Sequence, residues 1–452
     1  MKLLHNKYVL LNRISITLFA GIQFFAVLGL DPGFNPYDSH TYFNFTLSNP
    51  VRLPIVTAIY SSIKIFDLII IFQCLVSICA WVYCAKVLGS FLTNNKLKLS
   101  LSILLFSLAL SSPMLEQHTI LMSESLSVSL LVLIVASLAN YLRNRKQMNV
   151  AFLYLFLILF AGVKISNSYL VFITIILFIF FSILMENKTK WLSIILGSFI
   201  PLIFTTFFIY LGSQANITLK LVNTTNIIER SYDDLDLKSW YLQNDFPGIS
   251  YTQYVLPQDE PPIEKVINSP QVKKWLQIQE SDLVIKYLIE HPLFTIFAPL
   301  KPSQFIDGYT DFESIFPYLT MGTIHQNNTN LFSNLNAINM SREPDYLRAL
   351  TSNRLPFWST GKWAYGLFPS IIFLLIGLNL VLIRKFKDYA NEKNLITFLL
   401  IVAFLGIWSN WHFTVNYDMH RFLLPWSVLL RILAIFSLVS IVNQFSLKRR
   451  FN

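Results

Sequence analysis

Long apolar runs separated by short polar connections recur along the whole sequence. About ten runs can be traced, and most approach the roughly 20 residues that a helix needs to cross a bilayer. We therefore predict an α-helical polytopic membrane protein with about ten transmembrane helices. The runs lie near residues 9–30, 65–89, 98–112, 125–142, 150–164, 169–185, 191–212, 363–383, 395–411 and 422–443.

The third, fifth and sixth runs are short. Short spans suggest helices that end early, where a polar cavity enters the membrane. The first run is too long for the core of a signal peptide and has no small-residue cleavage site after it. We therefore expect the first run to stay in the protein as a membrane anchor.

The distribution of basic residues predicts the orientation. Cytoplasmic connections are enriched in Lys and Arg, and an N-terminus in the cytoplasm places nearly half of the 35 basic residues on that side. The short outer connections contribute few cations, among them Arg52, Lys164 and Arg421. We predict a multi-pass membrane protein with both termini in the cytoplasm. The inner cations are Lys2, Lys7, Arg13, Lys96, Lys98, Arg143, Arg145, Lys146, Lys188, Lys190, Arg384, Lys385, Lys387, Lys393, Lys448, Arg449 and Arg450.

One outer segment, residues 213–362, has the size of a domain. It carries 16 of the 25 acidic residues, and its apolar runs are short. We predict a mixed extracytoplasmic domain with a helix at 270–291 ended by Pro292, and a loop at 318–345. This segment separates an N-terminal transmembrane module of about seven helices (1–212), which includes the first outer loop (31–62), from a C-terminal module of about three helices (363–452).

Composition agrees with a membrane protein. Hydrophobic residues make up 54% of the chain and charged residues 13%, against about 25% charged in soluble domains. The net charge of +10 would suit nucleic acid, but Lys and Arg sit mostly in the short connections. We therefore expect a lipid bilayer and no nucleic acid as partner. Cys74, Cys79 and Cys84 share one apolar run and form neither a metal motif nor a disulfide framework.

Ionisable residues gather in the predicted outer connections. Such groups near membrane depth cost several kcal/mol unless they are paired or hydrated. Their accumulation on one side indicates a water-accessible cavity with a charged ligand. Carboxylates beside Lys and Arg suit a phosphate-bearing lipid and a proton transfer. The residues are Asp31, Asp38, His40, Tyr42, Arg52, His118, Glu124, Lys164 and Arg421.

Structural explanations compete with this interpretation. Asp31 and Asp38 stand beside Pro and Gly, where aspartate often shapes a turn. The segment 123–125 could cap a helix, with the acid in its first turn. Lys164 and Arg421 could be interfacial residues with charged ends in water. The histidines lack ligand spacing, so no metal or other cofactor is indicated.

Four short motifs carry a resemblance to a known family. They are Tyr37-Asp38-Ser-His-Thr-Tyr42 followed by Arg52-Leu-Pro54, Met122-Ser123-Glu124-Ser125-Leu126, Val163-Lys164-Ile-Ser-Asn167, and His420-Arg421-Phe-Leu-Leu-Pro425. In their order and common sidedness they resemble the GT-C superfamily of polyprenyl-phosphate-sugar glycosyltransferases, especially bacterial members that decorate surface polysaccharides. Many relatives have two adjacent acids in the first loop. Here Ser39 follows Asp38, which leaves metal dependence and the role of Asp31 open.

The resemblance implies an inverting transfer from a polyprenyl-phosphate-linked sugar to a glycan acceptor, such as O-antigen, on the outer face. It implies that Asp38 is the catalytic base. Lys164 and Arg421, with Arg52 as a third candidate, are the implied phosphate ligands. The residues implied to position the sugar or acceptor are Glu124, His118, Tyr42, His40 and Asp31.

Two other classes remain open. A flippase or transporter of lipid-linked sugars would also be polytopic, although the chain shows no internal repeat and its charges lie at one face. A polysaccharide polymerase or ligase would use a lipid-pyrophosphate glycan. The position of the key acid before the second span favours the monophosphate-sugar class.

Overall fold

The computed structural model describes residues 2–29, 33–34, 42–43, 52–111, 114–115, 117–119, 121–185, 188–214, 235–244, 270–272, 274, 280–297, 320–321, 367–384, 390–413 and 419–451. The elements are α1 (Lys2–Leu28), β1 (Gly33–Phe34), α2 (Pro54–Ile63), α3 (Phe66–Gly89), α4 (Asn95–Ala109), α6 (Glu124–Asn144), α7 (Gln147–Ala161), α8 (Ile165–Met185), α9 (Lys188–Gln214), α11 (Leu235–Gln243), α15 (Glu280–Glu290), α16 (Pro292–Phe297), β2 (Thr320–Met321), α21 (Leu367–Arg384), α22 (Ala390–Phe413) and α23 (Met419–Phe451).

A helix lies at each of the ten predicted spans. Among the described residues, seven helices are long and apolar enough to cross a membrane. Since a helix satisfies its own backbone hydrogen bonds in lipid, the chain is a multi-pass α-helical membrane protein. The seven spans are Lys7–Leu28, Phe66–Gly89, Glu124–Asn144, Ile165–Leu184, Trp191–Gly212, Asn391–His412 and Leu423–Ser446.

Two of the three predicted short spans are short. Helices α4 and α7 have 15 residues each. The prediction of a third short span at 169–185 is wrong, because α8 has 21 residues and begins at Ile165. Its first turns contain Asn167 and Ser168, whose side chains donate to the carbonyls of Phe160 and Ala161 at 3.2 and 2.8 Å. These bonds satisfy the polar side chains and allow the helix to start earlier than hydropathy indicated.

Helices α6 and α23 occupy the centre of the bundle. In both, 89% of the most apolar stretch is buried, against 17% in α1 and 28% in α9. Helix α6 packs on α3, α7, α22 and α23, while α1 packs on α3 and α4. The outer helices expose large apolar side chains such as Phe25 and Ile203, as lipid-facing positions do.

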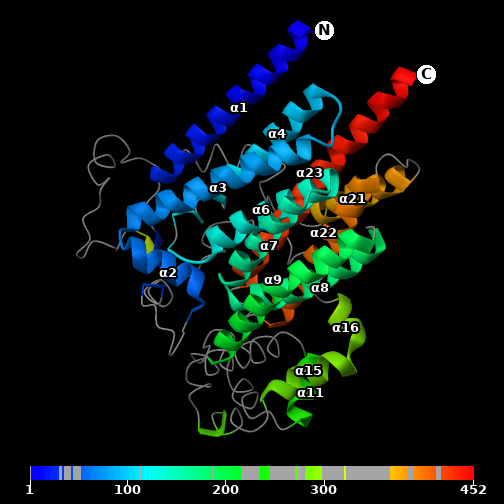
Figure 1. The fold of residues 1–452 in the computed structure, drawn as a ribbon. Coiled ribbons are helices and arrows are strands. Elements are labelled where there is room, and N and C mark those ends of the chain that lie inside the picture. The colour runs from blue at the N-terminus through cyan, green and yellow to red at the C-terminus, as the bar shows by residue number, and fades with distance from the viewer. Residues whose placement is uncertain are drawn as a thin grey trace.

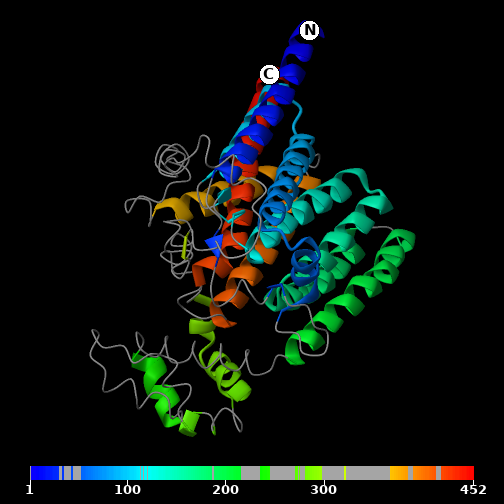
Figure 2. The same ribbon diagram turned by 90° about the vertical axis from the view of Figure 1, so that its left-hand side faces the viewer.

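Figures 1 and 2 place the two chain ends at one end of the bundle and α11 and α15 at the opposite end. The short helix α2 lies on the side away from the termini (Figure 1). This arrangement agrees with termini on one face and the 213–362 segment on the other. The assignment of either face to the cytoplasm stays a prediction.

The described part of residues 213–362 contains α11, α15, α16 and β2. Helix α15 ends at Glu290, as the predicted stop at Pro292 requires, and Pro292 itself begins α16. Strand β2 pairs antiparallel with β1, with Gly33 opposite Met321. The first outer loop therefore contacts the 213–362 segment. The remainder of the predicted loop at 318–345 lies outside the described residues, and the domain boundaries stay predictions.

Candidate functional site

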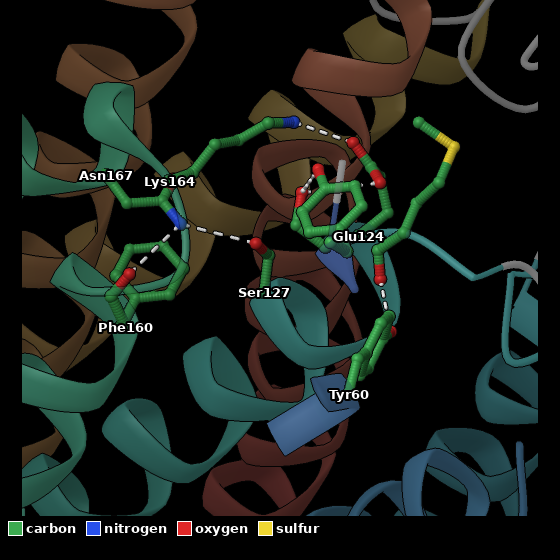
Figure 3. Close-up of polar contacts among 9 residues, drawn as sticks. Tyr60, Glu124, Ser127, Phe160, Lys164 and Asn167 are labelled. Atoms are coloured by element: carbon green, nitrogen blue, oxygen red, sulfur yellow. Dashed lines mark hydrogen bonds and ion pairs between the residues drawn. The ribbon is translucent and has the colours of Figure 1, made fainter. Parts of the chain in front are cut away.

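A buried ion pair joins two of the predicted site residues. Lys164 Nζ lies 2.7 Å from Glu124 Oε1, and the side chains are 15% and 2% exposed. Glu124 is the first residue of α6, and Lys164 directly precedes α8. Figure 3 shows the lysine reaching toward the carboxylate from the connection between α7 and α8. Chain connectivity alone does not require this pairing, because the two residues are 40 positions apart.

The head of α6 explains where the carboxylate points. A carboxylate in the first turn interacts favourably with the positive end of the helix dipole. Ser123 occupies the N-cap position and Glu124 the first turn, as the alternative explanation of 123–125 had it, but the Ser123 side chain makes no capping hydrogen bond. The Ser123 hydroxyl instead donates to Glu124 Oε2 over 3.5 Å. Ser123 therefore contacts the acid itself.

Two tyrosines from the start of the chain hold the same turn. The Tyr42 hydroxyl donates to Ser123 Oγ at 3.3 Å, and the Tyr60 hydroxyl donates to the Met122 carbonyl at 2.7 Å. Their ring centroids are 6.0 Å apart. The Arg52 guanidinium lies 5.0 Å from the centroid of the Tyr42 ring, within the range of a cation–π contact.

The structure thus brings Tyr42, Arg52, Glu124 and Lys164 to one place. Tyr60 was missed by the sequence analysis, because nothing in an apolar helix such as α2 marks one tyrosine as a partner of residue 122. Burial raises the pKa of the Tyr60 phenol well above its ordinary value, with smaller contributions from Tyr42 and Glu124. Tyr60 is therefore a neutral hydrogen-bond donor at physiological pH.

A close backbone approach places α2 against this site. The Ile55 amide donates to the Gly162 carbonyl at 3.2 Å. A side chain at position 162 would collide with Ile55, so glycine is required by space. Below this turn, Asn167 donates to Ser127 Oγ at 3.3 Å and to the Phe160 carbonyl (Figure 3). These contacts fix α8 against α6 and α7, and so fix Lys164 relative to Glu124.

His118 lies under the same turn and is fully buried. Its Nδ1 is 2.7 Å from Ser125 Oγ, and within the described part of the chain its Nε2 has no hydrogen-bond partner. Burial lowers the pKa of His118 to about 3, so the ring is neutral at pH 7. His118 contacts the residue that follows Glu124, and its predicted role toward the sugar stays a prediction.

Several predicted site residues cannot be placed. Asp31, Asp38 and His40 lie outside the described residues. Arg421 falls in the first turn of α23, but its side chain is likewise outside the description. No group of three metal-ligating side chains occurs among the described residues. The roles predicted for Asp38 and Arg421 therefore rest on the sequence motifs.

The sequence analysis overlooked a buried arginine in α23. Arg431 lies inside the apolar span of α23 and is 3% exposed. It donates through Nη1 to the Ser427 carbonyl at 3.2 Å and to the Ser427 hydroxyl. An arginine inside an apolar run is visible in the sequence, and intramembrane charges often mark function.

The fold and the site define a multi-pass membrane protein with a buried charge pair at the end of its bundle that lies away from the termini. No family model matches the chain, and no curated protein matches it. Among solved structures, it is similar to the archaeal oligosaccharyltransferase AglB from Archaeoglobus fulgidus, in complex with an inhibitory peptide and a dolichol-phosphate. The TM-score is 0.44 and the sequence identity 10%, over 97% of this chain and 51% of the other. This chain spans about half the length of that structure. A likeness at this level does not establish a family or an activity.

Proposed function

We propose that this protein is an inverting membrane glycosyltransferase. It moves a sugar from a polyprenyl-phosphate donor to a cell-envelope glycan, such as O-antigen, outside a bacterial inner membrane. The observation that carries the proposal is the buried Glu124–Lys164 pair, assembled with Tyr42 and Arg52 from the first outer loop. The resemblance of the four motifs supplies the reaction class.

The charge pair suits a phosphate-bearing lipid. Burying two charges costs several kcal/mol per ion, which mutual attraction only partly offsets. A protein that keeps such a pair at membrane depth has a use for a cation there. A lysine ammonium has three donors and can bond a carboxylate and a phosphate at the same time. In this arrangement Glu124 orients Lys164, and Lys164 meets the donor phosphate.

In the proposed reaction, a carboxylate takes up a proton and the cations stabilise the leaving phosphate. Asp38 takes the proton of the acceptor hydroxyl while the acceptor oxygen bonds to the anomeric carbon of the sugar. The bond from that carbon to the phosphate oxygen breaks, and polyprenyl phosphate leaves with the electron pair. Lys164 and Arg421, with Arg52 nearby, stabilise the growing negative charge, where preorganised cations are most effective. Glu124 is already bonded to Lys164, which favours Asp38 as the base.

Two variants test the proposal in purified protein reconstituted in liposomes. The substrates are a panel of polyprenyl-phosphate hexoses labelled in the sugar, with envelope glycan as acceptor. We expect label to enter the glycan, and we expect Asp38→Asn to abolish this transfer while the protein still binds polyprenyl phosphate. Lys164→Met should weaken polyprenyl-phosphate binding at least tenfold.

Other outcomes would refute the proposal in distinct ways. Normal turnover in Asp38→Asn would remove the assigned base. Movement of intact donor across the bilayer, without a new glycosidic bond, would indicate a flippase. Turnover of a lipid-pyrophosphate glycan in place of the monophosphate sugar would indicate a polymerase or ligase.

A further inference from the structure

Helices α15 and α16 carry an exposed apolar stripe. Ile285, Ile289, Leu293 and Ile296 are 50%, 73%, 71% and 46% exposed. Ile285 and Ile289 share one side of α15, and Leu293 and Ile296 share one side of α16, because their spacings are four and three residues. The stripe continues across the junction because the His291 amide donates to the Tyr287 carbonyl and the Thr295 amide donates to the His291 carbonyl. Four large aliphatic side chains in a row are unusual on a surface that faces water.

The opposite side of α15 is already occupied. Tyr287 stacks there on His291 with ring centroids 4.1 Å apart. At the edge of that side, Trp240 of α11 donates to Glu290 Oε2 at 2.9 Å. These contacts fix the rotation of α15 and turn the stripe outward. The buried residues of this small cluster are Leu237, Tyr241, Val272, Leu283, Tyr287 and Leu288.

Helix α16 is attached to the end of a membrane span. The Trp408 indole N–H donates to the Thr295 carbonyl at 2.7 Å, and His412 Nε2 lies 2.9 Å from the same oxygen. The ring of Phe294 contacts that of Trp411, with centroids 5.6 Å apart. The span of α22 runs to His412. The stripe therefore begins at the level where this span leaves the membrane.

Exposed apolar side chains line α22 up to its contact with α16. Ile401 and Phe404 are 45% and 36% exposed and lie within the apolar span, as expected of side chains that face lipid. Trp408 follows one turn later and is half-buried, in the position that tryptophan favours at a membrane–water boundary. Exposed apolar side chains thus lead along α22 to Trp408, whose indole bonds to the Thr295 carbonyl of α16.

We propose that α15 and α16 form an interfacial element whose stripe rests in the headgroup boundary of the bilayer. The partner is the lipid surface, because the stripe is aliphatic and α16, which carries half of it, is bonded to α22 where a membrane span ends. Amphipathic helices lie in this way with an apolar face sunk into the boundary region. Lys286 and Glu290, both more than 40% exposed, flank the stripe and stay in water. The inference does not depend on the proposed glycosyl transfer.

Site-directed fluorescence tests this location in the full-length protein. The three cysteines, all on α3, are first replaced by alanine. Single cysteines are then introduced as Ile289→Cys, Leu293→Cys and the control Glu290→Cys, and each is labelled with an environment-sensitive dye. In liposomes, each label is quenched either by phospholipid brominated near the headgroup or by aqueous iodide. We expect the ratio of lipid to iodide quenching to be at least threefold higher at 289 and 293 than at 290.

A ratio at 289 and 293 no higher than at 290 overturns the proposal, whether water or another part of the protein covers the stripe. The unsubstituted protein provides a second measurement that does not rely on folding of the variants. A phospholipid with a diazirine near its headgroup should leave photoadducts on residues 285–296. Labelling confined to the seven spans would also refute the inference.

Discussion

Removal of Lys164 should destabilise the protein by more than a surface ion pair can explain. Glu124 is 2% exposed, so Lys164→Met removes the cation that lies 2.7 Å from a buried carboxylate. Breaking a buried pair in this way costs about 3–5 kcal/mol. Glu124→Gln should cost less, on the order of 1 kcal/mol, because Lys164 is 15% exposed and can extend its charge toward water.

The double variant Lys164→Met with Glu124→Gln separates pairing from packing. It buries no charge, so we expect it to be more stable than Lys164→Met alone, with a coupling free energy of about 2 kcal/mol. The assay is reversible unfolding in mixed detergent micelles, followed by tryptophan fluorescence. A matched control exists in the Lys286–Glu290 pair, 4.0 Å apart and about half exposed, where Lys286→Met should cost below about 1 kcal/mol. Equal costs for Lys164→Met and Lys286→Met, or additive single variants, would refute the reasoning.

Two further predictions concern the turn at the head of α6. Tyr60→Phe removes the buried 2.7 Å hydrogen bond to the Met122 carbonyl. It should lower the free energy of unfolding by about 1–3 kcal/mol in the same assay, because that carbonyl loses its tyrosine donor. An unchanged unfolding midpoint would show that the bond does not hold the turn. Burial lowers the pKa of His118 to about 3 in the folded protein. As the pH falls, the imidazole of the unfolded chain therefore becomes protonated before that of the folded protein. Stability should therefore fall with pH below about 6.5, by about 2 kcal/mol between pH 7 and pH 5. His118→Gln should lose this part of the pH dependence, and an identical pH profile in the variant would contradict the assignment.

The pairing of Lys164 with Glu124 changes how these two residues are understood. Their sequence motifs suggested separate roles, one at the phosphate and one at the sugar. The structure joins them at 2.7 Å, so a substitution of either removes the ion-pair partner of the other. Binding experiments on Lys164 variants therefore need the stability measurements described above before a loss of affinity is assigned to the phosphate.

The positions of the membrane helices follow from the sequence alone. A bilayer fixes the length and polarity of a span, and a helix in lipid makes its backbone hydrogen bonds within itself. Each apolar run therefore carries its own structural information. The exception was the start of α8, because the predicted run began at residue 169, after Asn167 and Ser168. They bond to carbonyls seven residues earlier, which hydropathy does not register.

The residues of the candidate site could be predicted only in part from the sequence. Glu124, Lys164, Tyr42 and Arg52 were singled out as polar residues in predicted outer connections, and the structure brings them together. Tyr60 and the close approach at Gly162 were not identified, because an apolar helix gives no sign of which face meets which neighbour. Asp38, predicted as the base, lies outside the described residues and remains a prediction from its motif.

Pairing across the bundle was decided by tertiary structure. Tyr42 meets Ser123 across 81 residues of sequence, and Trp408 meets Thr295 across 113. Such contacts depend on how each helix is rotated about its axis, which is set by packing against several neighbours at once. Local hydropathy determined which segments form membrane helices. Packing between helices determined that Lys164 faces Glu124 and that the stripe of α15 and α16 faces outward.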